Sequence, residues 1–232
     1  MNKYKGAITA IVTPFTKNGA VDIRALKNFV EFQVRGGIDA IVACGSTGEA
    51  ATMNPEEYSL VIQTVVRQVN GRVPVIAGAG SNDTQKAVMF SRLAKDAGAE
   101  CLLHVTPYYN KPTLRGLIAH FGEIAKAVDL PIILYNVPGR TGLNLTAVMT
   151  LKIAQEIPSI IGIKEATGQM TRLQQILRLT EGHMDVFSGD DPTAASWMLA
   201  GAKGNISVTA NVAPKLMAKM CDCALDGDHA AS

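Results

Sequence analysis

Short apolar runs alternate with amphipathic segments along the whole chain. Each apolar run has the length and continuity of a strand that is buried on both faces of a sheet. The segments between the runs carry apolar residues every three or four positions, as an amphipathic helix does, and Asp22–Arg35 shows this most clearly. The predicted strands are Ala7–Val12, Ala40–Cys44, Val75–Gly78, Cys101–Val105, Ile132–Tyr135, Ile160–Lys164, Val186–Ser188 and Asn205–Val208.

The regular alternation of strand and helix predicts one parallel sheet, because parallel neighbours need a crossover connection between them. Repeats of roughly 20 to 35 residues fit an α/β fold of the (β/α)8 TIM-barrel type better than an open doubly wound sheet. We assign residues 1–225 to this barrel, with its last helix beginning near Ala213-Pro214. Residues 226–232 resemble the start of further sequence, so we expect a C-terminal extension to be missing from this chain.

The composition is that of an ordinary globular protein, because 47% of the 232 residues are hydrophobic and 18% are charged. A net charge of +2 gives no indication of a nucleic-acid or anionic-membrane partner. No apolar stretch has the length needed to cross a bilayer, and residues 1–6 lead into a predicted strand without the pattern of a signal peptide. We therefore expect a soluble, cytoplasmic protein.

The cysteines and histidines show no metal-site pattern. Cys44, Cys101, Cys221 and Cys223 lack zinc-ligand spacing, and the first two lie in apolar runs, where a free thiol behaves as a small hydrophobic group. The four histidines are scattered along the chain. We therefore predict neither a metal site nor a disulfide framework.

Lys164 ends the apolar run that begins at Ile160. A buried ammonium group is costly, so burial lowers the pKa of a lysine and favours a neutral amine, which can attack a carbonyl group to form a Schiff base. Taken alone, a lysine at a strand end more often pairs with a carboxylate or reaches solvent. The chemical interpretation therefore depends on which residues share its end of the barrel.

Further polar residues follow other predicted strands. Ser46 and Thr47 stand between glycines after the second strand, Tyr108 and Tyr109 follow the fourth, and Tyr135 ends the fifth. In a TIM barrel the carboxyl ends of the strands meet at one rim, where active sites are built. We therefore expect these side chains to gather at that rim.

Each of these features also has a purely structural interpretation. The glycine-rich segment 45–49 is compatible with a tight turn, Arg140 with a solvated loop charge, and Asp190-Asp191 with a helix cap. Their gathering with Lys164 favours Schiff-base chemistry on a keto acid. In that chemistry a tyrosine moves protons, hydroxyls or turn amides hold a carboxylate, and Arg140 binds a second carboxylate.

Five segments, in order along the chain, carry a family resemblance: Gly45–Glu49, Tyr108–Pro112, Tyr135–Gly142, Gly162–Gly168 and Ile206–Asn211. They closely resemble the 4-hydroxy-tetrahydrodipicolinate synthase family, also called the dihydrodipicolinate synthase family. The resemblance implies a lyase that condenses pyruvate with L-aspartate 4-semialdehyde, the first committed step toward diaminopimelate and lysine. It implies no cofactor other than the covalent Schiff base of pyruvate.

The same resemblance assigns catalytic roles. Lys164 would carry pyruvate as the Schiff base, and Tyr135 would donate and accept protons. Ser46 and Tyr109 would complete a proton relay with Tyr135, and Tyr109 would come from a neighbouring subunit. Arg140 would bind the carboxylate of the semialdehyde.

The resemblance also implies binding groups and an assembly. Thr47 and the backbone at Ile206 would hold the pyruvate carboxylate, with Gly189 nearby. Family members are usually dimers of dimers, so a homotetramer is expected. They also continue into a C-terminal helical extension that supports tetramer contacts.

Two features depart from the family pattern. Ser46 stands where threonine is usual, which keeps the hydroxyl but loses a methyl group that restricts rotamers. In the cleft where lysine-inhibited members have an acidic residue and histidines, this chain has Lys86, Pro55 and Tyr58. A cation at Lys86 repels the ammonium groups of lysine, so we predict weak or absent inhibition by lysine.

Two other functions are compatible with the sequence. N-acetylneuraminate lyase is another Schiff-base lyase and often has serine at the position of Ser46, but it generally lacks an arginine at the position of Arg140. A non-catalytic barrel that binds a keto acid would not need the nucleophile Lys164 together with Tyr135 and Thr47.

Overall fold

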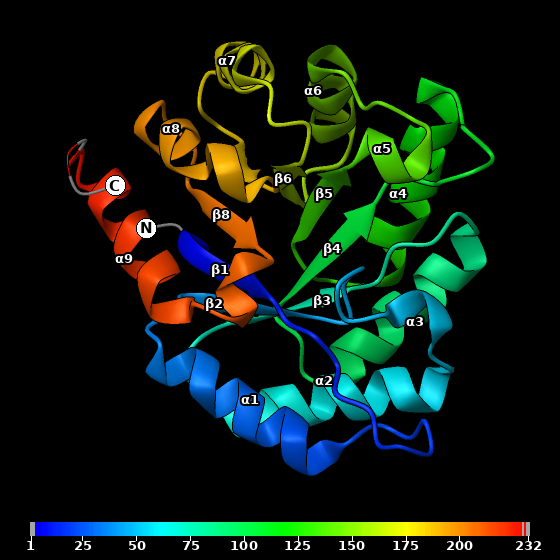
Figure 1. Cartoon of the computed structure of the whole chain (residues 1–232). Helices are drawn as coiled ribbons and strands as arrows, with labels where there is room; N and C mark the ends of the chain where they lie inside the picture. Colours follow the sequence, from blue (N-terminus) through cyan, green and yellow to red (C-terminus); the bar gives the residue numbers. More distant parts are fainter. Residues whose placement is uncertain (1–2, 229, 231–232) are drawn as a thin grey trace.

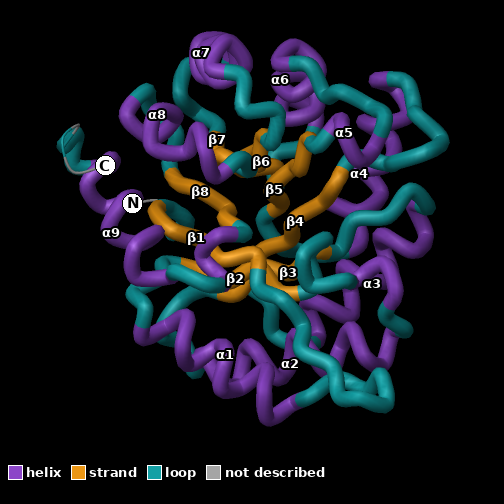
Figure 2. The backbone as a smooth tube through the Cα atoms, in the orientation of Figure 1, coloured by secondary structure: helices purple, strands orange, loops and turns teal. Residues whose placement is uncertain are grey.

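The protein is described by a computed structural model over residues 3–228 and 230. Within these residues, eight parallel strands form a closed barrel in sequence order, and β1 pairs with both β2 and β8. Figure 1 shows the helices arranged around the strands, and Figure 2 shows the strands as one central ring. The predicted TIM-barrel fold is confirmed.

The strands are β1 (Gly6–Ala10), β2 (Ala40–Ala43), β3 (Val75–Gly78), β4 (Cys101–Val105), β5 (Ile132–Asn136), β6 (Ile160–Glu165), β7 (Asp185–Ser188) and β8 (Gly204–Ser207). The α-helices are α1 (Ile23–Arg35), α2 (Pro55–Val69), α3 (Thr84–Asp96), α4 (Leu114–Ala127), α5 (Pro138–Thr141), α6 (Ala147–Glu156), α7 (Met170–Leu179), α8 (Ala194–Leu199) and α9 (Pro214–Leu225). Short 3-10 helices follow β2, β7 and β8, namely η1 (Ala50–Thr52), η2 (Asp191–Thr193) and η3 (Thr209–Asn211).

Capping side chains fix where the first two helices begin. Asp22, predicted as the first residue of a helix, is instead the N-cap of α1 and accepts a hydrogen bond from Ala25 N at 2.9 Å. Asn54 and Glu57 form a capping box at the start of α2, in which each side chain satisfies a backbone N–H that has no partner within the helix. Each cap marks the point at which a rim loop passes into the following helix.

Several strand ends differ from the predicted ones by one or two residues. β1 begins one residue earlier and ends two residues earlier, β7 begins one residue earlier, and β8 is displaced by one residue. β2 ends before Cys44, because Cys44 turns the chain with a left-handed φ of 53°. β5 and β6 both extend one residue further, because Asn136 pairs with Glu165.

The apolar side chains form two clusters on opposite faces of the barrel wall. The inner cluster fills the barrel with side chains from alternate strand positions, including Ile8, Val42, Ile133 and Phe187. The larger outer cluster lies between strands and helices and includes Leu26 of α1. Because these side chains fill the interior, the rim residues lie above a layer of packed apolar side chains.

The separation of a barrel at 1–225 from a short segment at 226–232 stays a prediction. Helix α9 ends at Leu225, and residues 229, 231 and 232 of the following segment lie outside the described residues. Across the part of the chain that the structure describes, no helix combines the length and apolarity required for a membrane span.

Candidate active site

Lys164 points into the barrel near the carboxyl end of β6. Its neighbours across the sheet are Tyr135 on β5 and Phe187 on β7, and only 5% of the lysine is exposed. Gly162 precedes it on the inner face, where an added Cβ would lie 3.2 Å from the ring of Phe187. The absence of a side chain at Gly162 therefore lets this ring fill the barrel beside the lysine.

Burial lowers the pKa of Lys164 from 10.5 to about 8, with the charge of Asp191 opposing the change and that of Arg140 adding to it. An appreciable fraction of the side chain is therefore a neutral, nucleophilic amine near pH 8. The Nζ atom lies 4.6 Å from the centroid of the Tyr135 ring. At that distance the aromatic face also attracts a cation on this nitrogen.

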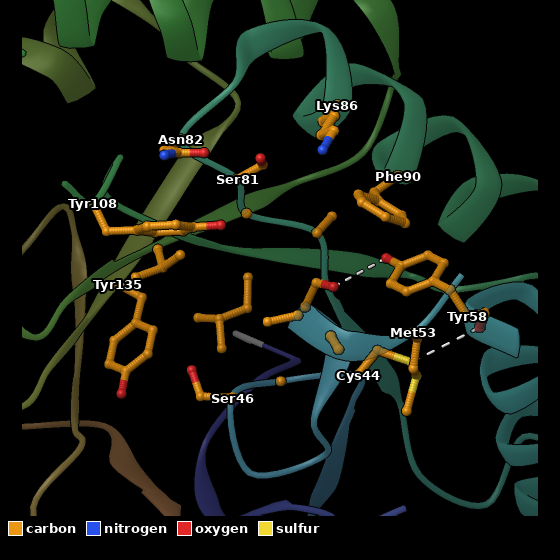
Figure 3. Close-up of a pocket in the computed structure, with 18 of the residues that line it drawn as sticks. Cys44, Ser46, Met53, Tyr58, Ser81, Asn82, Lys86, Phe90, Tyr108 and Tyr135 are labelled. Atoms are coloured by element: carbon orange, nitrogen blue, oxygen red, sulfur yellow. Dashed lines mark hydrogen bonds between the residues drawn. The ribbon is translucent and has the colours of Figure 1, made fainter. Parts of the chain in front are cut away.

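Tyr135 contributes a phenol that stays protonated at neutral pH. Its side chain lies at the carboxyl end of β5, and burial raises its pKa, although the positive charge of Arg140 lowers it. Figure 3 shows the hydroxyl groups of Tyr135 and Ser46 at the same end of the drawn cavity, and both residues also line the smaller cavity beside Lys164. The phenol is therefore placed to donate a proton there.

The turn after β2 places Ser46 and Thr47 at the rim. The carbonyl oxygen of Gly48 accepts a hydrogen bond of 2.8 Å from Thr13 Oγ1, which ties the turn to the segment after β1. Ser46 is exposed and Thr47 is half-buried. Both residues line the cavity beside Lys164, where their hydroxyls can meet a polar ligand.

A cavity of about 180 Å³ unites these groups. Since one water molecule occupies about 30 Å³ of liquid, the cavity has room for a small organic molecule. Most of the residues predicted for the site line it: Lys164, Tyr135, Ser46, Thr47, Arg140 and Gly189. The other lining residues are small or apolar: Ala10, Val42, Gly45, Leu103, Val137, Ala166 and Val208.

Ile206 and Tyr109, the other two predicted site residues, do not line this cavity. Ile206 is 1% exposed and belongs to the inner apolar cluster, while Val208 reaches the cavity instead. Tyr109 is 89% exposed and has a left-handed φ of 71°, so in the single chain it lies outside the cavity. The place of Tyr109 in a proton relay stays a prediction, because it requires a second subunit. The role of the Ile206 backbone also stays a prediction, because it requires a bound carboxylate.

A larger cavity of about 370 Å³ continues from the same rim, and Ser46 and Arg140 line both spaces. Lys86, Pro55 and Tyr58 line the larger one, so the residues predicted for a regulatory cleft do lie together. Figure 3 shows Lys86 and Tyr58 of this set. Among its described lining residues, the charged side chains are those of Lys86 and Arg140. The cavity therefore carries positive charge only.

Asn136 and Glu165 form a polar pair that the sequence analysis did not single out. Asn136 follows Tyr135, Glu165 follows Lys164, and both polar side chains are fully buried. Burial raises the pKa of Glu165, while the hydrogen bond from Asn136 lowers it. A signal was present in the sequence, since an amide and a carboxylate directly follow Tyr135 and Lys164 at the ends of two largely apolar runs.

Asp191 braces the end of β8, while Asp190 stands at the N-cap position of η2, within the pair predicted to cap a helix. Its Oδ2 atom accepts hydrogen bonds from Val208 N at 3.1 Å and Thr209 N at 2.8 Å, and its Oδ1 atom accepts one from Asn205 Nδ2 at 2.7 Å. Neither Asp190 nor Asp191 makes a side-chain cap hydrogen bond. Although burial raises the pKa of Asp191, these hydrogen bonds hold it below its ordinary value, so a negative charge persists near Lys164.

Within residues 3–228 and 230, no three His, Cys, Asp or Glu side chains come together in an arrangement suited to a metal ion. The cysteines are all free thiols.

Comparisons with known proteins find relatives over nearly the whole chain. The sequence profile of the Dihydrodipicolinate synthetase family matches residues 3–232. A 4-hydroxy-tetrahydrodipicolinate synthase from Legionella pneumophila is 56% identical over 227 residues, which cover 98% of this chain and 78% of that protein. One from Methylococcus capsulatus is 50% identical and covers 97% of this chain and 77% of its own.

A solved structure shows the same likeness in three dimensions. The crystal structure of the chloride-inhibited dihydrodipicolinate synthase from Acinetobacter baumannii, in complex with pyruvate, superposes with a TM-score of 0.94 at 51% identity. The match covers 97% of this chain and 77% of that one. The barrel and its rim are therefore shared over nearly the whole of the present sequence.

Proposed function

The chain belongs to the dihydrodipicolinate synthetase family, and from this premise we propose that Lys164 forms the Schiff base through which the protein condenses pyruvate with L-aspartate 4-semialdehyde. The activity is that of a lyase, 4-hydroxy-tetrahydrodipicolinate synthase. The observation that carries the proposal is the position of Lys164, whose buried amine faces Tyr135 in a cavity with room for a small keto acid.

The first half of the reaction activates pyruvate. The neutral Nζ of Lys164 adds to C2 of pyruvate, and one water leaves the carbinolamine to give the imine, with Tyr135 donating a proton to the departing hydroxyl. Thr47 and the turn around it supply donors for the pyruvate carboxylate. Removal of a proton from C3 then gives an enamine, and Tyr135 is placed to exchange that proton.

The second half forms the product. The enamine carbon attacks the aldehyde carbon of the semialdehyde, a carbon–carbon bond forms, and the aldehyde oxygen takes up a proton. The amino group of the semialdehyde then adds to the imine carbon and displaces Lys164, which closes the ring. Arg140, which lines both cavities, offers a bidentate partner for the second carboxylate. The Schiff base on Lys164 thus activates pyruvate covalently, so the reaction needs no separate cofactor for this step.

The test is reductive trapping. Pyruvate followed by borohydride should add the reduced pyruvate group to Lys164, as located by mass spectrometry of peptides. Lys164→Met, which keeps the length of an apolar side chain, should give no adduct, whereas Lys152→Ala at an exposed position should leave the adduct intact. Turnover of the semialdehyde but not of sialic acid distinguishes this activity from that of N-acetylneuraminate lyase. A wild-type protein that binds pyruvate without an adduct would be a keto-acid-binding barrel.

Two further parts of the proposal concern the cell and the assembly. We propose a homotetramer arranged as a dimer of dimers, supported by the exposed aromatic ring of Tyr109 on a rim loop. Sedimentation of the wild type and of Tyr109→Ala tests this, since loss of a subunit contact at this residue should weaken association. A cytoplasmic location is proposed with it and is checked by fractionation of the source cells.

A further inference from the structure

A buried hydrogen-bond pair joins the ends of the two strands that carry Lys164 and Tyr135. Asn136 Nδ2 donates to Glu165 Oε2 at 2.8 Å, and both residues are 0% exposed. They are also the last register pair between β5 and β6. The contact therefore fixes how the two strand ends lie against each other.

Each member of the pair has further partners. Asn136 Oδ1 accepts a hydrogen bond from Leu145 N at 2.9 Å, and Asn136 Nδ2 also donates to Asn144 Oδ1 at 3.1 Å. Glu165 Oε1 accepts from Thr167 N at 2.9 Å. The hydrogen-bonding groups of the pair are thus engaged on both sides, as buried polar groups require.

A buried cation completes the cluster. Arg172 Nε lies 3.8 Å from Glu165 Oε2, and Arg172 Nη2 donates to Asn144 Oδ1 at 3.3 Å. The guanidinium therefore offsets part of the cost of burying the carboxylate. Arg172 comes from α7, so the cluster connects β5, β6, the segment after α5 and α7.

The cluster lies on the face of the barrel wall opposite to the cavity. Successive side chains of a strand point to opposite faces, and Asn136 and Glu165 directly follow Tyr135 and Lys164. Through Leu145 the same cluster holds the chain that leaves α5, the short helix that carries Arg140. This buried cluster therefore supports Lys164, Tyr135 and Arg140 from the outer face of the barrel wall.

We propose that Asn136 and Glu165 are positioning residues, whose mutual hydrogen bond sets the geometry between the Lys164 amine and the Tyr135 phenol. The assignment rests on the proposed role of Lys164 as the Schiff-base residue. A buried amide–carboxylate pair is directional, whereas two apolar side chains would fill the same space without fixing a register. Misplacement of reacting groups by about 1 Å can cost roughly 100-fold in rate, so this register matters to the chemistry.

The pair allows a reciprocal test, because its donor and acceptor can be exchanged. Asn136→Asp sets two carboxylates against each other, and Glu165→Gln leaves too few acceptors for the N–H groups of Asn136 and Thr167. The double variant restores the direct contact, since the introduced amide donates to the introduced carboxylate and still accepts from Thr167 N, although Asn144 Oδ1 loses the donor that Asn136 Nδ2 supplied. Leu145 N also keeps its acceptor.

The measurement is the rate of reductive trapping at saturating pyruvate, together with the melting temperature and the KM for pyruvate. We expect each single variant to trap about 100-fold more slowly while still folded, and the double variant, which regains the direct contact but not the one to Asn144, to recover part of the rate. Thr9→Val serves as the matched control, because it removes a buried 2.8 Å hydrogen bond from Thr9 of β1 to Gln33 of α1, away from β5 and β6. It should lower the melting temperature without changing the trapping rate.

The outcomes separate the two proposals. If the wild type forms no adduct at Lys164, the proposed function itself is wrong. If the wild type forms the adduct, and the folded single variants trap at the wild-type rate, Asn136 and Glu165 are structural only. A double variant that traps no faster than the slower of the two single variants would equally overturn the positioning role.

Discussion

Lys164 Cε lies 2.8 Å from the position that a Cβ on Gly189 would occupy, and Lys164 Cγ lies 3.1 Å from it. The lysine side chain therefore runs directly against the backbone that follows β7. Gly189 has no left-handed φ that would require glycine. Glycine is needed here for space, because any side chain would occupy the volume of the nucleophile's own methylene groups.

The variant Gly189→Ala should therefore disable Lys164 without unfolding the barrel. The added methyl group displaces the lysine side chain, and a displacement near 1 Å is expected to slow Schiff-base formation by about 100-fold. Trapping with pyruvate and borohydride measures this rate. Gly122→Ala, at a helical position with nothing within 4 Å of the new Cβ, is the control and should behave as the wild type. Equal rates for both variants would contradict the argument.

The pKa of Lys164 predicts how Schiff-base formation depends on pH. The neutral amine is the nucleophile, and burial lowers the pKa from 10.5 to about 8, so the rate should rise with pH and level above about 8. Below that value the rate should fall by about tenfold per pH unit, as the ammonium form takes over. Trapping with cyanoborohydride across this range gives the midpoint. Arg140→Gln should move the midpoint upward, and a wild-type midpoint near 10.5 would show that the amine is not desolvated.

The fold and the buried position of Lys164 were predictable from the sequence because each has a strong local signal. Strand and helix alternate with distinct periods, and a lysine at the end of an apolar run is unusual in itself. The β5 and β6 ends were each placed one residue short, since Asn136 and Glu165 are polar and look like loop residues. Their burial depends on partners from distant segments, such as Arg172 and Leu145, which no local pattern reveals.

The role of Asp191 was missed for a related physical reason. An aspartate before a proline at a helix start resembles a cap, whereas its acceptors here serve backbone N–H groups of the chain after β8. That contact exists only because closure of the barrel brings β7 beside β8. Sequence patterns describe neighbours along the chain, and the site is built largely from neighbours across the sheet.

Ser46 should contribute through its hydroxyl. Ser46→Ala is expected to lower kcat by about 100-fold, the scale of a lost proton-transfer group. Ser46→Thr keeps the hydroxyl and adds a methyl group that restricts its rotamers, so its kcat should equal or exceed that of the wild type. Steady-state kinetics with both substrates measures this. An unchanged rate in Ser46→Thr would show that the methyl group is irrelevant, and full activity in Ser46→Ala would remove Ser46 from the relay.

Lysine should inhibit this protein weakly or not at all. The larger cavity carries the positive charges of Lys86 and Arg140, which repel the ammonium groups of lysine. Lys86→Glu should introduce inhibition by lysine, because the reversed charge attracts the ligand. Lys95→Glu, on the same helix but outside the cavity, should not. The measurement is the rate against lysine concentration at fixed substrate concentrations. Half-maximal inhibition of the wild type at low-millimolar lysine would contradict the prediction.

His104 and His120 should make the protein less stable in mild acid. Burial lowers the pKa of His104 from 6.5 to about 3 and that of His120 to about 4. Ser91 Oγ already donates to Ala87 O, so His104 Nε2 donates to Ser91 and a proton on Nδ1 would find no acceptor.

The unfolded chain binds protons at these histidines below pH 6.5 and the folded chain does not, so stability is complete above that pH and falls as the pH decreases toward the folded pKa values. At pH 5 the loss is about 2 kcal/mol for each histidine, which urea unfolding at pH 7.5 and pH 5 can measure. His104→Gln should flatten this pH dependence and His183→Gln, at an exposed position, should not; equal slopes in all three proteins would exclude the buried histidine as the cause.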